Sequence, residues 1–411
     1  MNILFLCSEP PFPTNNGVRI PAYNFIKCLS KYHNIKLLCF GSNSKNEDEE
    51  CRLELSKYCN AVEFIERKVV RKHIKLLRFL FSRKPHFIDN HHDSLMASRI
   101  KYHIEKYNLD VIHFDTLPMS TFRTIDIGNC ATVISPNDSC SLAIENEISW
   151  KIQSSFLLFV FNRVLLKKTK RFESLSYPKF DYCHVVSQVD GNYLKSLNPQ
   201  INTRVIANAV DTEYFKPTCF SPEGKLALFV GSLYGGSGTY MKIFISKVWR
   251  HVMELHPDAR LYIAGKSTPE LIREMQAISH GIVPLGYVDD IRTCYSQTLT
   301  VVNPVLKNCG IVNKALEGMS MGRTVVGHTV SFSGIPQCKN GFNVMMGDNP
   351  VQLVDAFDEL FCYPNRAIEI GKMARQLIEE HYTWESRCGL INALYEDAFL
   401  NNTDAERGNI E

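Results

Sequence analysis

Short runs of apolar residues recur along this chain, and stretches with helical periodicity separate many of them. In the first half such runs begin at residues 3, 35, 110, 132, 182 and 204, and in the second half at 226, 260, 282, 299 and 324. Continuous apolar runs of this length are typical of strands buried in a parallel sheet. Between the first two runs, Ile20, Tyr23, Ile26 and Leu29 share one face of a helix. The pattern predicts an α/β fold.

The pattern restarts near Leu226, so the chain is predicted to hold two facing Rossmann-like doubly wound domains with a deep cleft between them. We expect an N-terminal domain over 1–217 and a C-terminal domain over 218–383, with 208–217 as the linker. Helices are expected over 240–255 and 311–321 in the second half. Ligands of such sheets bind beyond the carboxyl ends of the strands. The residues that directly follow the strands are therefore the candidates for chemistry.

Charge and composition exclude several classes of protein. Lys and Arg number 46 against 43 Asp and Glu, a net charge of +3, so the broad positive field of a nucleic-acid-binding protein is absent. No apolar run is long enough to span a membrane, and the N-terminus lacks the basic start of a signal peptide. The 14 cysteines are scattered, without Cys-x-x-Cys spacing. We expect free, mostly buried thiols in a reducing cytoplasm, and no metal site.

The segment from Gly310 to Gly322 carries the clearest chemistry. A glycine precedes an expected helix, and the first turn of a helix offers backbone N–H groups to an anion. Glu317 lies within that helix among apolar residues, where its carboxylate can accept hydrogen bonds from two vicinal hydroxyls. The alternative is that Glu317 is an ordinary solvated helix residue.

This segment resembles the nucleotide-sugar site of family 4 glycosyltransferases, in particular their exopolysaccharide branch with its Gly-Ile-x-Asn-Lys-x-Leu-Glu-x-Met-x-Met-Gly pattern. Segments 111–115, 205–215 and 256–265 are similar to other parts of that family. The resemblance spans about residues 1–400. It implies the two-domain GT-B fold, with a helix over 384–400 that packs back on the first domain. It also implies retention at the anomeric carbon, no required metal and no cofactor.

In the family, the second glutamate of a Glu–seven residues–Glu motif binds the ribose, and Glu317 matches it. Cys309 takes the place of the first glutamate, and Ser232 and Ser237 stand where relatives have basic residues for the diphosphate. Lys266 and Lys314 are candidate replacements. The glycine-rich loop either approaches the phosphates or is a surface loop. The expected donor-binding residues are Gly231, Ser232, Gly235, Gly236, Lys266, Gly310, Ile311, Val312, Asn313, Lys314 and Glu317.

Acceptor binding and catalysis are expected in the first domain. Gly17 opens a helix, and Arg19 can pair with a phosphate or acidic acceptor, or be a surface arginine. His113 and Asp115 end a strand, so they are the candidate catalytic residues, with a hydrogen-bonded core histidine as the alternative for His113. Two further polar residues follow the next strand, and they bind the acceptor or cap a helix: Asn137 and Asp138.

Two stretches, 67–81 and 156–171, join apolar bulk to lysine and arginine. Such helices lie on anionic membranes or pack in a core with a solvated basic face. We therefore expect a cytoplasmic protein. If these helices lie on a membrane, we expect the protein to be peripheral on the inner face of the plasma membrane. The expected partners are a nucleoside-diphosphate sugar and a glycan or lipid-linked acceptor, and no nucleic acid. The alternatives to a transferase are a nucleotide-sugar epimerase of the same fold and a catalytically silent nucleotide-sugar-binding subunit.

Overall fold

The computed structural model describes residues 1–14, 16–42, 44–67, 81–88, 93–150, 156–217, 224–307 and 310–407. The chain divides into two compact units: unit 1 comprises Met1–Ala207 and Trp384–Glu411, and unit 2 comprises Asn208–Thr383. This division lies before the boundary expected at residue 217. Residues 208–217 belong to unit 2 because the carbonyl of Phe215 accepts hydrogen bonds from Ser320 Oγ (2.6 Å) and Arg375 Nη1 (2.7 Å).

Unit 1 is built on a parallel seven-stranded sheet with the order β3-β2-β1-β4-β5-β6-β7. The central strand β1 is almost wholly apolar, and Ile3 pairs with both Ile35 of β2 and Val111 of β4. Strands with neighbours on both sides and helices on both faces bury every side chain, which explains the continuous apolar runs. The strands are β1 (Asn2–Cys7), β2 (Asn34–Phe40), β3 (Ala61–Ile65), β4 (Val111–Asp115), β5 (Ala131–Asn137), β6 (Tyr182–Val185) and β7 (Thr203–Val205).

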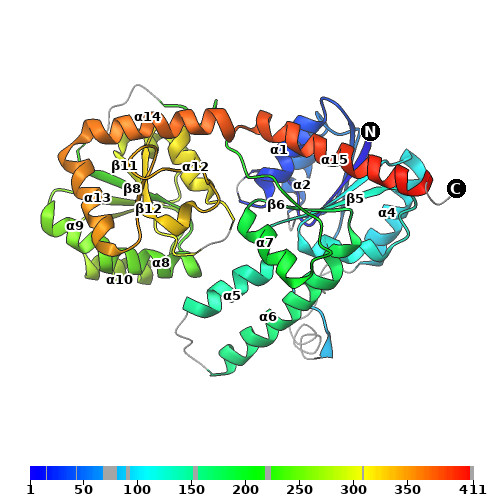
Figure 1. Ribbon diagram of the computed structural model, residues 1–411, viewed down its shortest axis with the longest axis horizontal. Helices are drawn as coiled ribbons and strands as arrows, with labels where there is room; N and C mark the ends of the chain where they lie inside the picture. The colour runs from blue at the N-terminus through cyan, green and yellow to red at the C-terminus, as the bar shows by residue number, and fades with distance from the viewer. Residues whose placement is uncertain are drawn as a thin grey trace. The chain divides into compact units, whose positions relative to one another are not determined.

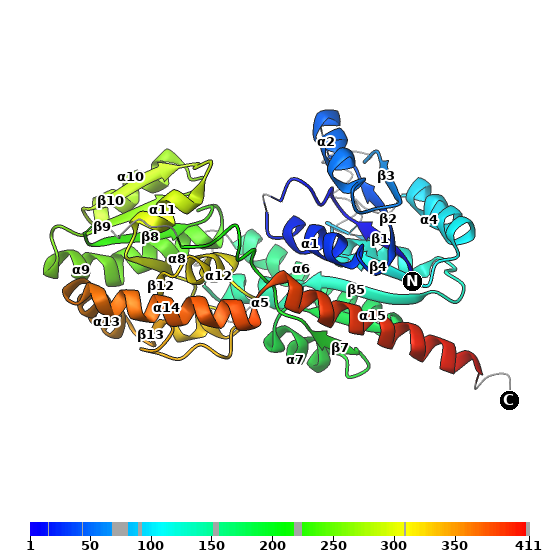
Figure 2. The same cartoon turned by 90° about the horizontal axis from the view of Figure 1, so that it is seen from above.

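Helices cover both faces of this sheet (Figures 1 and 2). The C-terminal helix α15 (Trp384–Arg407) belongs to unit 1 and packs against α1 and β5. Phe25 of α1 meets Trp384 edge to face, with ring centroids 5.8 Å apart. The other helices are α1 (Arg19–Leu29), α2 (Lys45–Leu55), α4 (Ser94–Tyr107), the 3-10 helix η2 (Leu117–Thr124), α5 (Cys140–Trp150), α6 (Phe156–Ser176), the 3-10 helix η3 (Tyr177–Lys179) and α7 (Gln188–Leu197).

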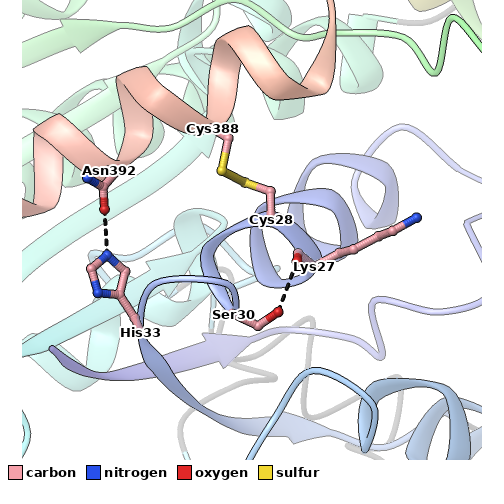
Figure 3. The surroundings of a disulfide bond; sticks show 6 residues. All are labelled: Lys27, Cys28, Ser30, His33, Cys388 and Asn392. Atoms are coloured by element: carbon pink, nitrogen blue, oxygen red, sulfur yellow. Dashed lines mark hydrogen bonds between the residues drawn. A yellow bond between two sulfur atoms is a disulfide. The ribbon is translucent and has the colours of Figure 1, made fainter.

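A disulfide ties α15 to α1 and corrects the expectation of free thiols. Cys28 and Cys388 are bonded to each other although 360 residues separate them (Figure 3). His33, in the turn after α1, also contacts the side-chain amide of Asn392 on α15 through a hydrogen bond. The return of α15 to unit 1 places the two cysteines in contact, which no local spacing could indicate. Most of the remaining described cysteines are free and buried, as expected.

Unit 2 is a parallel six-stranded sheet with the order β10-β9-β8-β11-β12-β13, which is the strand order of a dinucleotide-binding Rossmann fold. Two doubly wound domains were predicted, and both are present. The strands are β8 (Leu226–Val230), β9 (Arg260–Ala264), β10 (Ile282–Gly286), β11 (Thr300–Asn303), β12 (Thr324–His328) and β13 (Met345–Gly347).

The helix expected over 240–255 begins earlier and is interrupted. Helix α8 (Gly236–Phe244) passes through a π-helical turn, η4 (Ile245–Trp249), into α9 (Arg250–Leu255). The π turn places Trp249 in the core against Phe357 and Phe361. The other helices of unit 2 are α10 (Pro269–Ile278), α11 (Ile291–Gln297), α12 (Asn313–Ser320), the 3-10 helix η5 (Thr329–Phe332), α13 (Pro350–Cys362) and α14 (Pro364–His381).

None of the helices in the described ranges is both long enough and apolar enough to cross a membrane.

Candidate active site

The glycine-rich segment after β8 is a fixed turn. Gly231 and Gly235 have φ values of 151° and 65°, which glycine adopts most readily. A Cβ atom at Gly265, at the end of β9, would lie 2.1 Å from the carbonyl oxygen of Gly231. The N–H of Leu233 donates to the carbonyl of Lys266 at 2.9 Å, so the turn is fastened to the neighbouring strand end. The turn is therefore part of the sheet edge and not a detached surface loop.

Helix α8 begins directly after this turn without a capping side chain. Gly235 is its N-cap and Gly236 its first residue, so the N–H groups of the first turn are available to an anion. Ser232, which replaces a basic residue of relatives, is exposed, and its Oγ is 3.5 Å from the N–H of Tyr234. The positions expected to hold a diphosphate here are thus brought together, although they carry no charge of their own.

The second predicted helix start, at Gly310, lies slightly later in the structure. Helix α12 begins at Asn313 with Val312 as its N-cap, so Gly310 and Ile311 form the approach to the helix. Gly310 has a φ of 55°, and a Cβ on Gly334 would lie 2.4 Å from its carbonyl oxygen. The amide of Asn208 donates to Asn313 Oδ1 at 3.1 Å. The prediction that concerns Cys309 falls outside the described residues.

Glu317 is held in the interior of unit 2 by two donors. The residue is 5% exposed, and the Tyr295 hydroxyl donates to Oε2 at 3.1 Å. Burial, together with the charge of Glu317, raises the pKa of Tyr295, so this hydroxyl keeps its proton. Lys314 Nζ lies 2.8 Å from Oε1 and 3.1 Å from Oε2. Glu317 is therefore not a solvated helix residue, and its carboxylate retains lone pairs for further donors.

Lys314 consequently differs from its predicted role. Its ammonium forms the ion pair with Glu317 one helical turn away, so its charge is already matched by a carboxylate. Lys266 is exposed directly after Gly265, and no carboxylate in the described ranges lies within ion-pair distance of it. Of the two replacement cations predicted from the sequence, the structure thus leaves Lys266 beside the glycine turn.

A third lysine, which sequence reasoning missed, lies against the start of α8. Lys307 follows β11 and is 9% exposed, and its Nζ is 5.4 Å from the ring centroid of Tyr240. Tyr240 packs beside Gly236, where a Cβ would contact its ring at 3.7 Å. Lys307 therefore belongs to the same corner of unit 2 as the uncapped helix. The sequence signal that could have identified Lys307 is its position shortly after the end of a strand.

In unit 1, His113 is a core residue, which corrects its assignment as catalytic. It is fully buried, its ring stacks on Phe5 with centroids 4.5 Å apart, and Nδ1 is 2.6 Å from the hydroxyl of Tyr395. Burial, and to a lesser extent the nearby His184, lowers the pKa of His113 to about 3, so the ring is neutral. Position 113 lies in the middle of β4, where both faces of the sheet are covered.

Asp115 is the last residue of β4 and is 3% exposed. None of the described residues donates a hydrogen bond to its carboxyl group. Burial first, and then the charge of Glu9, raises its pKa well above the usual range. The chain leaves β4 through Thr116, and the φ of 72° at this residue is strained for a β-branched side chain. Asp115 is thus a buried carboxyl group, with its neutral form favoured, at a strained strand end.

Arg19 is not available to an acceptor. Its guanidinium pairs with Glu9 at 3.1 Å and with Glu47 at 2.5 Å, and its side chain is 10% exposed. This corrects both the expected anion site and the alternative of a surface arginine. Gly17 is exposed, and Asn16 Oδ1 accepts from the backbone N–H groups of Val18 and Arg19 at 2.9 Å. The beginning of α1 therefore has its own capping partner.

Asn137 and Asp138 form a polar corner after β5. Asn137 has a φ of 67°, and its Oδ1 is buried without a hydrogen-bond partner in the described ranges. Asp138 is exposed to solvent at one side, but desolvation, with the charge of Asp190, raises its pKa to about 7. Ser139 Oγ accepts from the N–H of Leu142 at 3.3 Å and so caps α5. The helix thus has its cap without these two residues.

Comparison with known proteins finds a family match in unit 2. Residues 224–362 match the family described as "Glycosyl transferases group 1". Unit 2 therefore carries a glycosyltransferase domain of this group. No curated protein sequence matches it. The matched residues span most of unit 2 and include the glycine turn, Lys307 and Glu317, so the resemblance seen at 310–322 is confirmed at the level of the glycosyltransferases.

Solved structures show the same fold over the whole of this chain. Sucrose-phosphate synthase from Thermosynechococcus elongatus aligns with a TM-score of 0.72 and 15% identity over 98% of this chain and 100% of that one. HepE from Anabaena, in complex with UDP-glucose, aligns with a TM-score of 0.67 and 14% identity over 97% and 100%. A Rickettsia africae glycosyltransferase aligns with a TM-score of 0.66 and 15% identity over 96% and 98%. The predicted fold class is confirmed.

Proposed function

We propose that this enzyme transfers a sugar from a nucleoside-diphosphate donor, bound by unit 2, to a hydroxyl of a surface glycan or its lipid-linked precursor. The observation that carries the proposal is the Glu317 carboxylate, which is buried, ordered by Tyr295 and Lys314, and still able to accept hydrogen bonds. The structure of HepE in complex with UDP-glucose supports a donor of this class.

The two hydroxyls of a ribose match the chemistry of Glu317. A carboxylate accepts at two oxygens and binds vicinal hydroxyls with two charge-assisted hydrogen bonds. Lys314 fixes the rotamer of Glu317, because its ammonium lies 2.8 Å from Oε1 one helical turn away. Lys314 is thus a positioning residue of the ribose site and not the counter-ion of the diphosphate.

The diphosphate is proposed to bind at the glycine turn and the start of α8. Backbone N–H groups around Gly235 and Gly236 supply the donors, and the dipole of α8 favours the negative charge. Lys307 and Lys266 supply the positive charge that Ser232 and Ser237 lack. Leaving-group charge is then stabilised by these fixed groups, in keeping with a reaction that retains the anomeric configuration and requires no metal.

The acceptor is proposed to bind unit 1 at the ends of β4 and β5. Asp115, in its neutral form, can donate to one acceptor oxygen, and the unpartnered Oδ1 of Asn137 can accept from a hydroxyl. Asp138, with its pKa near neutrality, can take up a proton from the attacking hydroxyl. His113 and Arg19 have no part in this proposal.

The experiment is a donor screen followed by product analysis. Uridine, guanosine, adenosine and thymidine diphosphates and their sugars are tested for binding by calorimetry, and the best donor is then incubated with acceptor-bearing membranes. Transfer that persists in EDTA supports the proposal. Donor conversion without an acceptor would identify an epimerase, and binding without turnover a silent subunit.

Lys307 provides the variant for this screen. Lys307→Met is expected to weaken diphosphate binding about tenfold, because one charge-assisted contact is lost. Lys242→Met is the matched control on α8, where the ammonium pairs with Glu274 at 2.7 Å on the surface. Equal binding by the two variants would remove Lys307 from the diphosphate site.

We also propose that α6 contacts an anionic membrane. Leu157 is 79% exposed, and Leu158, Phe159, Val160 and Val164 are between 37% and 43% exposed. Five basic residues lie on the same helix: Arg163, Lys167, Lys168, Lys170 and Arg171. The α5–α6 hairpin projects from the sheet of unit 1 (Figure 1). Exposed apolar side chains beside basic ones fit a lipid surface. Most of the other basic stretch, 68–80, lies outside the described residues.

Vesicle sedimentation tests this contact. The protein is expected to bind vesicles that contain anionic lipid, and to bind neutral vesicles weakly. Leu157→Ser should reduce the binding about tenfold, because one leucine no longer enters the lipid. Leu53→Ser, on the exposed face of α2, is the control. Indifference to lipid charge and to Leu157→Ser would contradict the proposal.

A further inference from the structure

Three side chains with different metal-ligating atoms meet on the surface of unit 2. They are His256, Asp358 and Cys362, and one ligand atom of each lies within 4.8 Å of the other two. His256 Nε2 is 2.8 Å from Asp358 Oδ1, and Cys362 Sγ is 3.7 Å from the same oxygen. Helices α9 and α13, which carry the residues, lie side by side in both views (Figures 1 and 2).

The backbone fixes all three positions. Asp358 and Cys362 are four residues apart in the last turns of α13, so their side chains share one face. His256 is the C-cap of α9, and its N–H donates to the carbonyl of Val252 at 2.8 Å. Its ring meets Phe361 edge to face, with centroids 5.5 Å apart, which directs Nε2 toward α13. The cluster is thus preorganised before any ligand arrives.

One side of the cluster is open to solvent. His256 is 6% exposed, whereas Asp358 is half-exposed and Cys362 is exposed. An ion can therefore enter from the surface and retain water. The ammonium of Lys225 lies near Cys362 and repels a metal cation bound there. Its Nζ pairs with Asp258 Oδ1 at 3.0 Å, and the charge of this carboxylate offsets the repulsion.

We propose that His256, Asp358 and Cys362 bind a borderline-soft divalent cation of the zinc class, with water as the fourth ligand. Imidazole, carboxylate and thiolate are the ligands of Zn²⁺, at about 2.0–2.3 Å from the metal. A tetrahedral site of those bond lengths needs ligand atoms roughly 3.3–3.8 Å apart, which small side-chain rotations achieve here. A carboxylate and a thiolate also balance the two positive charges. Mg²⁺ and Ca²⁺ are disfavoured, because they prefer oxygen ligands.

The metal site lies near the amino ends of the strands of unit 2, whereas the proposed donor site lies at their carboxyl ends. Asp258 and Lys225 precede β9 and β8, whereas the glycine turn follows β8. A five-residue strand spans about 17 Å, so an ion here does not reach the donor. It would instead clamp the end of α9 to the end of α13. The inference is independent of the proposed function.

Cobalt titration of the full-length protein, first stripped with EDTA, tests the site. One equivalent of Co²⁺ is expected to give a thiolate-to-cobalt charge-transfer band and intense tetrahedral d–d bands, and Zn²⁺ should abolish them by displacement. Cys362→Ser should remove the charge-transfer band, and Asp358→Asn should weaken binding about tenfold or more. Cys338→Ser, at another free cysteine of unit 2, is the control and should leave the spectrum unchanged.

A second measurement uses the unmodified chain and so avoids any folding defect of a variant. Alkylation of Cys362, followed by mass spectrometry, is expected to slow at least about tenfold with one equivalent of Zn²⁺ and to be unchanged with Mg²⁺. A cobalt spectrum without the thiolate band, a band retained in Cys362→Ser, or alkylation unaffected by Zn²⁺ would each overturn the proposal.

Discussion

The two units have the same kind of doubly wound sheet but different residues at the carboxyl ends of the strands. In unit 2, Gly231 and Gly265 follow β8 and β9, and lysines stand at 266 and 307. In unit 1, an acid and an amide stand at the ends of two other strands, Asp115 at the end of β4 and Asn137 at the end of β5. The topology places chemistry at the strand ends in both units, and the residues there decide what binds. The residues at these strand ends are the basis for the proposals that unit 2 binds an anion and unit 1 binds hydroxyl groups.

Among the described residues, carboxyl groups with raised pKa values occur in unit 1. Three carboxyl groups of unit 1 have raised pKa values, and desolvation is the main cause for each: Asp115, Asp138 and Glu173. In the described part of unit 2, the shifted carboxyl pKa values are lowered, at Asp258 and Asp290, by hydrogen bonds from Lys225 and Arg292. These three acids of unit 1 are buried without a cation, whereas other acids of unit 1, such as Glu63 with Arg99, are paired with one, as the two acids of unit 2 are.

The largest expected effect concerns the disulfide of unit 1. Cys28→Ser is expected to lower the free energy of unfolding by about 3–5 kcal/mol, because the bond closes a very long loop. Chemical denaturation of the variant measures this loss, and wild type in reducing buffer should match it. The loss should appear in the unfolding of unit 1. Equal stability of wild type in oxidising and reducing buffer would contradict the role of this bond.

Gly265→Ala probes the glycine strand ends of unit 2. The new Cβ would lie 2.1 Å from the carbonyl of Gly231, and the φ of 144° is unfavourable for alanine. We expect a loss of about 2–4 kcal/mol in the free energy of unfolding. Gly389→Ala is the control, since nothing lies within 4 Å of its Cβ. Similar denaturation midpoints for both variants would show that the close approach of the two strand ends is not required.

Glu173 makes the contrast between the acids measurable. Burial raises its pKa to about 7, whereas hydrogen bonds from Ser141 and Ser139 oppose the shift. A raised pKa in the folded state means that stability is greatest below the unfolded pKa and is lost as pH rises through about 7. Glu173→Gln should therefore gain about 2–3 kcal/mol relative to wild type between pH 4 and pH 8, as shown by urea denaturation across that range. A difference that does not change with pH would refute the shift.

The sequence predicted the central strands and both domains because buried parallel strands are continuous apolar runs. Strands β3 and β13 were missed: both are short edge strands, and β3 carries Glu63, which pairs with Arg99. His113 and Arg19 were misassigned because burial and partners from distant segments decided their roles. The pairing of Cys28 with Cys388 likewise depends on the return of α15. The burial of Glu317 could be predicted because a local helix pattern of apolar residues surrounds it.

The most direct test of the account is calorimetric titration of Glu317→Gln with the nucleoside diphosphate that wild type binds best. We expect binding about 10- to 100-fold weaker than in wild type, because the charged acceptor of two ribose hydroxyls is lost. Glu270→Gln, on the exposed start of α10, should bind as wild type does, and the thermal midpoints of both variants show that they are folded. Unchanged affinity in a folded Glu317→Gln protein would contradict the account.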